Sequence, residues 1–333
     1  MYYKTQVHDQ ILCKGTLIQS SWPSQHHMIG LIRDLKLKVI HQEDADDGRV
    51  RIWDGAACII EGIASRLKDT CITLSVTATV IEKMGNIIKV TVRNANSEQD
   101  ILYTKHLVWT GPPRMALSPF LQWSPLLSNS KMTAQQSCST WMASVTKVAF
   151  IYEKKYWDDN WIMEMKRGIY FYRDGEAFDI YDACLEQNEN DIYAFTLFAL
   201  IDWSKYDKNG EKSEQNESIE KRLMEQLLSI ATSKRMLSSQ TNNPSVWLSQ
   251  YKICTMHHWP NVSSISDDPS PSTVGSHPYP NASLSQPEWK SDDGIRDLIF
   301  FAGTESDLRS PGLMEGAVGS AYRVMDELKR NWM

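Results

Sequence analysis

The sequence predicts an α/β fold, and three observations lead to that prediction. Residues 28–39 and 56–67 carry apolar side chains at helical spacing. Further along, the spacing changes to every second residue, and two strands flank a turn at residues 84–86 as in a hairpin. Near the C-terminus, residues 298–302 form a short apolar run that Gly303 ends, and a glycine-rich helix start follows. Helices and strands in this mixture favour a layered α/β architecture.

The remaining elements follow in chain order. Residues 102–110 are predicted to form a strand that Gly111, Pro112 and Pro113 stop. Residues 145–152 read as an apolar strand that Lys147 interrupts. Three more strands are predicted after it, at residues 169–172, 177–181 and 192–200. A polar loop at residues 207–220 and a helix at residues 219–232 are predicted to follow.

The segment around Gly303 is the most informative part of the chain. A glycine there lets the backbone turn sharply after the strand, and the carboxylate of Glu305 follows closely. Gly312, Gly316 and Gly319 then open a helix on small residues, so backbone N–H groups at its N-terminus can face an anion. A strand, a glycine turn with a carboxylate and a glycine-started helix together indicate a phosphate-bearing cofactor.

Composition excludes several classes of partner. The 333 residues are 42% apolar and 23% charged, which is an ordinary globular balance. The net charge of −6 argues against nucleic acid or an anionic membrane as a partner. No run of 18 apolar residues exists, so no membrane span is expected. The six cysteines are scattered without a C-x-x-C pair, and the start lacks the apolar stretch of a signal peptide, so a cytoplasmic location without zinc is expected.

The C-terminal segment resembles the signature of the flavin-containing amine oxidases, the group of monoamine oxidases, polyamine oxidases and L-amino-acid oxidases. That family writes F-A-G-T-E, a short loop, then S-G-Y-M-E-G-A-V and a helix. Leu313 stands where the family usually has an aromatic residue. The matching positions are Phe301, Ala302, Gly303, Thr304, Glu305, Gly312, Met314, Glu315, Gly316, Ala317 and Val318.

The resemblance implies an incomplete FAD-binding domain of the Rossmann-like, amine-oxidase type, together with a second, sheet-based substrate domain. The FAD-binding-type domain is expected to be discontinuous, at residues 1–113 and 291–333. The substrate-type domain is expected at residues 114–290, with a polar loop at 260–287. Non-covalent FAD is the expected cofactor, because Ser276 stands where monoamine oxidases carry the flavin-linking cysteine.

The resemblance also assigns site residues. The hairpin backbone near Val76 is expected to touch the adenine, while the Gly303 turn and the following helix start hold the dinucleotide. The complete set of expected cofactor-binding residues is Val76, Gly303, Thr304, Glu305, Gly312, Leu313 and Met314.

Three residues are expected to act in catalysis. The family carries a lysine at the position of Lys147, where it contacts the flavin N5 through a water and assists reoxidation by oxygen. The alternative for Lys147 is a surface lysine whose stem alone is buried. Trp259 and His277 are expected to flank the flavin ring, although the family usually has an aromatic residue in place of His277.

Two departures from the family leave two functions open. No G-x-G-x-x-G exists, and Met1 begins, by resemblance, after the βαβ unit that carries that motif. Residues 47–55 join two parts that the family separates by a long helical insertion. One expectation is an FAD-dependent oxidoreductase that oxidises an amine or a biosynthetic intermediate with oxygen. The other is a truncated or non-catalytic protein, acting as a scaffold or as one half of a split enzyme, with a second polypeptide completing the FAD site.

Overall fold

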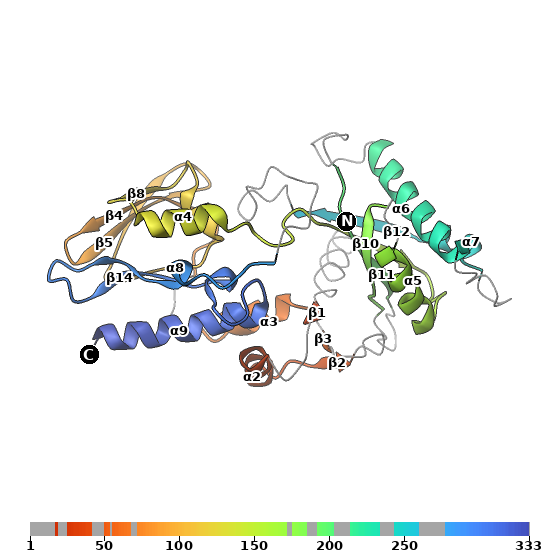
Figure 1. Cartoon of the computed structure of the whole chain (residues 1–333), viewed down its shortest axis with the longest axis horizontal. Helices are drawn as coiled ribbons and strands as arrows, with labels where there is room; N and C mark the ends of the chain where they lie inside the picture. The colour runs from red at the N-terminus through yellow and green to blue at the C-terminus, as the bar shows by residue number, and fades with distance from the viewer. Residues whose placement is uncertain are drawn as a thin grey trace.

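The structure is a computed structural model that describes residues 17–18, 25–41, 50–53, 55–67, 72–171, 175–184, 192–202, 214–233, 243–259 and 277–332. The predicted α/β class is confirmed, since helices and several sheets alternate along the chain (Figure 1). The strands are β1 (Leu17–Ile18), β2 (Val39–His41), β3 (Val50–Ile52), β4 (Val76–Met84), β5 (Ile87–Asn94), β6 (Gln99–Thr104), β7 (Leu107–Trp109), β8 (Gln122–Ser124), β9 (Thr146–Tyr152), β10 (Ala177–Asp182), β11 (Tyr193–Ala199), β12 (Ile253–His258), β13 (Glu288–Lys290) and β14 (Asp297–Phe301).

The helices cover or connect these strands. The α-helices are α2 (His26–Asp34), α3 (Ala57–Ala64), α4 (Asn129–Ser137), α5 (Asp159–Phe171), α6 (Glu214–Ser233), α7 (Pro244–Trp247), α8 (Ala282–Ser285) and α9 (Met314–Trp332), and the short 3-10 helices are η2 (Pro113–Leu117), η5 (Leu248–Gln250) and η7 (Thr304–Ser306).

Two of the sheets lie in the same part of the molecule as α9 (Figure 1). In the first, β6, β5 and β4 form an antiparallel meander, and β8 joins β4 in parallel. The predicted hairpin is therefore confirmed, with Met84 opposite Ile87 and Gly85 at a φ of 64° in the turn. In the second, β14 runs parallel to β7 and antiparallel to β13. The parallel pair joins the last part of the chain to the first third, as the resemblance requires.

After Asp297, β14 is apolar from Leu298 to Phe301 because both of its faces are buried there. Ile299 and Phe301 pack with the meander in one core, whereas Phe300 packs against Val324 of α9 on the other side. Burial on two faces removes the polar alternation of a half-exposed strand, and this is the run that the sequence displays at residues 298–302.

The largest core belongs to the antiparallel sheet ordered β10-β11-β9-β12. Helices α5 and α6 pack on the face that carries Val148 and Phe150. The opposite face carries Lys147 and Ala149, which pair in register with residues of β11 and β12. The expected division into two domains at residues 113 and 290 stays a prediction.

Three sequence predictions are corrected. The strand predicted at residues 169–172 is wrong where the structure describes it, because Ile169 continues the buried helical stripe of α5. The strand predicted at 102–110 is two strands, β6 and β7, separated by a bend in which the Thr104 hydroxyl donates to the His106 carbonyl (2.7 Å). The helix predicted at 28–39 ends at Asp34, since Lys36 adopts a left-handed φ of 56°.

Candidate functional site

The carboxyl ends of β7 and β14 meet at one edge, where α/β sheets usually bind ligands. Phe301 lies opposite Trp109, and the next amide, Ala302 N–H, donates to the Trp109 carbonyl (2.9 Å). Gly303 follows with a φ of 126°, a conformation that side chains disfavour. A β-carbon at this glycine would meet its nearest neighbour, the Thr110 carbonyl oxygen, only at 3.6 Å. The backbone conformation, and not crowding, therefore requires glycine, because a β-carbon there would make only ordinary van der Waals contact.

Thr304 and Glu305 occupy the turn after this glycine, in η7. The Thr304 hydroxyl donates to the Leu313 carbonyl (2.7 Å), which ties the turn to the entry of α9. The Glu305 side chain is buried, and burial raises the pKa of its carboxyl group. Glu305 shares a cavity of about 10 Å³ with Trp109 and Gln135. Glu305 thus lines an internal space at the site.

The entry to α9 departs from the expected anion cradle. The Gly312 N–H donates to the Thr304 carbonyl (3.3 Å), and the Leu313 N–H donates to the Ser310 carbonyl (3.3 Å). Two of the amides expected to face a phosphate therefore already have partners in the chain. Met314 begins α9 and packs in a small core with α2 and α3.

Gly312 itself is enclosed by protein. Its φ is 81°, and a β-carbon there would lie 2.9 Å from Pro278 and 3.4 Å from Trp141. His277 adjoins this contact, because its ring centroid lies 4.6 Å from that of Trp141. A side chain at position 312 would disturb this packing, so loss of a cofactor in a Gly312 variant would not by itself locate that cofactor.

Lys147 and Trp259 lie at one end of the β9–β12 pair. Lys147 is only 6% exposed and sits between Phe198 on β11 and His257 on β12. Its ammonium is 5.8 Å from the centroid of the Phe198 ring. Trp259 directly follows β12, donates its backbone N–H to Val145 (3.4 Å), and has its ring 4.3 Å from that of His257. The burial of Lys147 argues against an exposed surface lysine.

Sequence reasoning missed three groups. His257 and His258 are the last two residues of β12. The Thr146 hydroxyl lies 2.8 Å from the His258 Nδ1, and burial together with His257 lowers the pKa of His258 to about 4. Lys131 of α4 is 1% exposed and donates to the carbonyls of Leu284 (3.0 Å) and Gln286 (2.6 Å). A polar residue that interrupts an apolar pattern is only a weak sign of such a buried group, because the partners of the group are distant in sequence.

Glu315 is the third missed group, although it belongs to the signature. Its buried carboxylate accepts the backbone N–H groups of His27 (3.0 Å) and Met28 (2.7 Å). Both amides belong to the first turn of α2, where backbone N–H groups have no acceptor within the helix. The N-cap residue, Gln25, forms no side-chain cap bond to them. Glu315 therefore caps a helix from nearly the other end of the chain.

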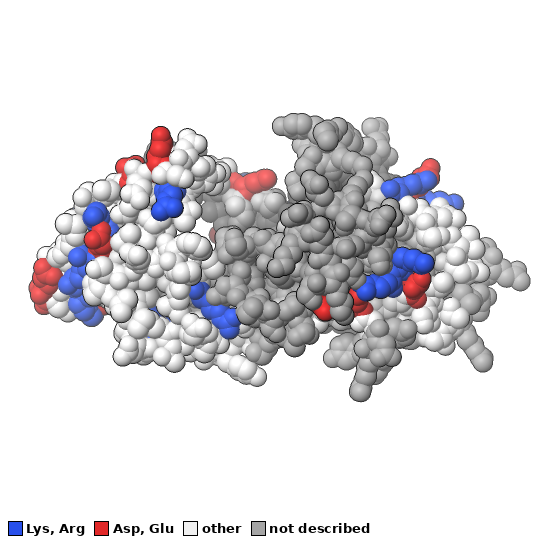
Figure 2. Space-filling model, turned by 90° about the horizontal axis from the view of Figure 1, so that it is seen from above, with Lys and Arg blue, Asp and Glu red and all other residues white. Residues whose placement is uncertain are grey.

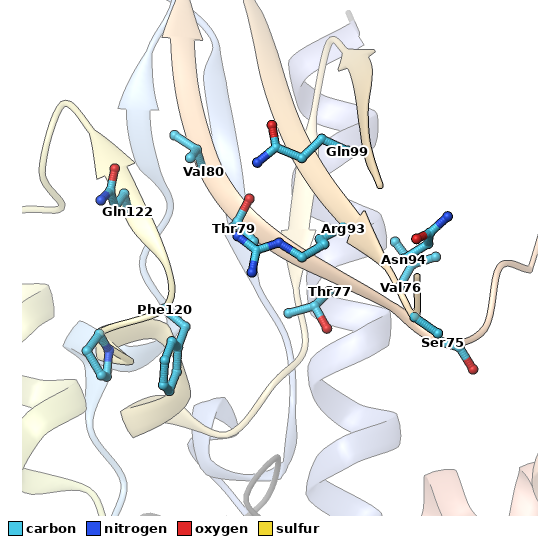
Figure 3. Close-up of a pocket in the computed structure, with 12 residues that line it drawn as sticks. Ser75, Val76, Thr77, Thr79, Val80, Arg93, Asn94, Gln99, Phe120 and Gln122 are labelled. Atoms are coloured by element: carbon cyan, nitrogen blue, oxygen red, sulfur yellow. The ribbon is translucent and has the colours of Figure 1, made fainter. Parts of the chain in front are cut away.

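Val76 lines an open concavity of about 940 Å³ beside β4, which Figure 3 shows with its lining residues. The sides come from the starts of β4 and β6, the end of β5 and the segment before β8. Thr77, Arg93 and Gln99 are direct cross-strand neighbours on this sheet face. The backbone that was expected to meet an adenine therefore borders a space large enough for a small ligand.

Other classes of site find no support among the described residues. No group of three or more His, Cys, Asp or Glu side chains among them could hold a metal ion. Their helices include none that is long and apolar enough to cross a bilayer. On the face drawn in Figure 2, the described acidic and basic side chains are interspersed, which does not favour a nucleic-acid surface there.

A family model and several solved structures of known proteins match this chain. A model described as flavin containing amine oxidoreductase matches residues 25–328. Cyclohexylamine oxidase from Brevibacterium oxydans IH-35A is similar in structure, with a TM-score of 0.51 and 16% identity over 85% of this chain and 55% of that chain. Wild-type putrescine oxidase bound to putrescine gives a TM-score of 0.54 and 14% identity over 87% of this chain and 56% of that chain. This chain thus spans little more than half the length of either. No curated protein matches.

Proposed function

Because the chain belongs to the flavin-containing amine oxidoreductases, we propose that it works as an FAD-dependent oxidoreductase on an amine or on a biosynthetic intermediate with a C–N bond. Family membership implies FAD as its cofactor, and Ser276 at the position of the flavin-linking cysteine implies that FAD is bound without a covalent link. The observation that carries the proposal is the β7–β14 edge, where the parallel pair ends in a turn whose backbone requires glycine. When bound, FAD supplies an acceptor for the hydride of the C–H bond next to nitrogen.

The residues fit a flavin dinucleotide in part. The concavity at Val76 leaves space beside β4, whereas the cavity at Glu305 measures only about 10 Å³. The amides of Gly312 and Leu313 are engaged within the chain, so they contribute less than the sequence indicates. We assign the holding of FAD to the Gly303 turn and to the β4 backbone, with Glu305 and Met314 supporting this site from within.

Lys147, Trp259 and His277 are assigned to the reaction as a proposal. Lys147 is buried on the sheet face opposite to α5 and α6, and its proposed role is to hold a water and a proton away from bulk solvent. Trp259 packs against the His257 ring and His277 against the Trp141 ring, and their proposed role is to flank the flavin ring. Since Leu313 and His277 replace the usual aromatic pair, a substrate other than a simple amine is favoured.

Flavin binding tests the proposal directly. We expect the purified chain, after incubation with FAD and removal of excess, to retain the visible absorption of an oxidised flavin. FAD should also raise the thermal midpoint, since a ligand at about 100 times its Kd adds about 2.7 kcal/mol to the free energy of unfolding. Riboflavin, which lacks the dinucleotide, is the control. A chain that folds but neither retains FAD nor gains stability would support the alternative, a non-catalytic scaffold.

Lys147→Met tests the role of the buried lysine. The substitution shortens the side chain by one atom only and removes its charge and its ionisable proton. We expect it to slow reoxidation by oxygen more than reduction by an amine, measured separately by stopped-flow absorbance. Lys154→Met, on an exposed lysine just after β9, is the control. Equal slowing of both half-reactions would assign Lys147 to substrate binding or to the fold. If oxygen did not reoxidise the flavin of the wild type, oxygen would not be the electron acceptor.

A further inference from the structure

Strand β6 forms an open edge of the meander. It pairs with β5 along its whole length without a register shift, and no strand among the described residues pairs with its other side. Natural proteins usually block such an edge with proline, a bulge or lysine within the strand. The sequence of β6, Gln-Asp-Ile-Leu-Tyr-Thr, contains neither proline nor lysine, and its pairing contains no bulge. The edge is therefore able to pair with a further strand.

The apolar side chains of β6 are exposed, although the sheet beside them is buried. Ile101, Leu102 and Tyr103 are 46%, 53% and 61% exposed. Leu102 lies opposite Val90, which belongs to the core that also holds Ile81. The apolar face of the sheet thus continues to its edge, where Leu102 stays in contact with solvent. Covering this strip with another chain would remove apolar surface from water, which favours association.

The backbone groups of Ile101 and Tyr103 point out of the sheet. The Thr91 carbonyl accepts the hydroxyl of Thr79 from β4 (3.2 Å), so Thr91 directs its backbone groups toward β4. Ile101 lies opposite Thr91, and its N–H and carbonyl therefore point away from β5. Consistent with this, the Ile101 N–H donates to the adjacent carboxylate of Asp100 (2.7 Å). Because the direction alternates along a strand, Tyr103 also presents its backbone groups at the edge.

We propose that two copies of this chain pair through β6, antiparallel and about a two-fold axis at Leu102. Outward-pointing residues exchange the hydrogen bonds of an antiparallel pair, so Ile101 lies opposite the partner's Tyr103. Both such pairs join an aliphatic to an aromatic side chain, a favourable cross-strand combination. On the other face Leu102 meets the partner's Leu102, which extends the apolar core across the axis. The strand is thus complementary to a second copy of itself.

Charge and register favour a second copy as the occupant. Asp100 lies near the start of β6 and Lys105 directly after its end, and both are exposed. An antiparallel copy brings each acidic start beside the basic end of the other copy, and the two-fold axis repeats this match. The next allowed registers, two residues to either side, would place Leu102 opposite Asp100 or Thr104. Pairing through β6 needs no cofactor, so it does not rest on the proposed function.

Sedimentation of the whole chain over a range of concentrations tests the pairing. We expect the wild type to form a dimer that dissociates on dilution. Leu102→Lys places two like charges opposite each other at the axis and should raise the Kd of the dimer at least about tenfold. Leu74→Lys is the matched control, because Leu74 is 80% exposed and lies before β4, and this variant should leave the Kd unchanged.

A cysteine on the axis tests the register. In the proposed pair, the Cα atoms of Leu102 and the partner's Leu102 lie about 4.5 Å apart, which is within the range of a disulfide. Leu102→Cys should therefore give a covalent dimer under mild oxidation, which a reducing agent reverses. Thr104→Cys should not, because its two copies lie about 13 Å apart along the strands. The wild type, which has six cysteines of its own, sets the baseline for both.

Each outcome supports or overturns the proposed dimer. A wild type that stays monomeric at every concentration would overturn it and leave the edge to a different partner. A dimer that Leu102→Lys leaves intact, or that Leu74→Lys weakens equally, would show that the copies meet elsewhere. Should Leu102→Lys fail to fold, the cysteine variants decide: crosslinking of Leu102→Cys alone supports the register, and its absence, or crosslinking of Thr104→Cys instead, refutes it.

Discussion

Gly316→Ala is expected to lower the free energy of unfolding by about 2–3 kcal/mol, because a single methyl group has no room at this position. A β-carbon on Gly316 would lie 2.2 Å from the carbonyl oxygen of Ser310 and 3.1 Å from the side chain of Asp307. The obstructing atom belongs to the backbone, so it cannot move without shifting the loop that ends at α9. Urea denaturation of the two proteins measures the difference.

Gly30→Ala is the matched control, since Gly30 also lies within a helix, α2, but a β-carbon there meets nothing within 4 Å. This substitution should stabilise the protein by about 0.5–1 kcal/mol through the higher helix propensity of alanine. The two Gly→Ala substitutions are thus expected to change the free energy of unfolding in opposite directions. If both stabilise the chain, the start of α9 is not packed against the Ser310 carbonyl.

Glu315→Ala is expected to destabilise the protein by about 2–3 kcal/mol, which is typical for loss of buried hydrogen bonds to a charged group. It leaves the N–H groups of His27 and Met28 without an acceptor inside the protein. Hydrogen exchange of these two amides should accelerate, which a general loss of packing around α9 would not single out.

Two variants define the cause of this effect. Glu315→Gln keeps one acceptor oxygen and should lose about half as much stability. Glu61→Ala removes an exposed carboxylate from α3 and should stay within about 0.5 kcal/mol of the wild type. A Glu315→Ala protein as stable as Glu61→Ala would mean that the carboxylate is not a cap for α2, and the contact between the two ends of the chain would lose its main polar link.

Sequence patterns were sufficient to predict an element where the residues that determine it lie close together in the chain. The hairpin around Gly85 was predictable because alternating apolar residues and a glycine turn lie within one short segment. The run ending at Phe301 was predictable because burial on two faces leaves an unbroken apolar strand. The segment around Ile169 was not, since short aromatic and β-branched runs fit a strand or a buried helix equally well, and the continuous stripe of α5 decided it.

The signature illustrates what a motif conveys about a site. Gly303 and Gly312 were expected to bind a cofactor, Glu315 was noted only as a matching position, and the fold gives the three residues different tasks. Gly303 serves the turn, Gly312 packs against Pro278, and Glu315 caps α2. Phosphate cradles and tight helix entries both need glycine and a nearby acceptor or donor, so residue types and spacing alone cannot distinguish a contact with a ligand from a contact within the chain.

The sequence by itself determined the α/β class, the hairpin, the strand that leads to Gly303 and the resemblance to the flavin-containing amine oxidases. These depend on contacts between neighbours in the chain or on the order of a motif. Tertiary structure alone decided that Glu315 meets α2, that the amides at Gly312 and Leu313 are bonded internally, and that the apolar residues of β6 stay exposed at the edge of a sheet. The reason is physical: burial, charge and hydrogen-bond partnership depend on groups brought together from far apart in the chain, and no local pattern specifies which distant group arrives.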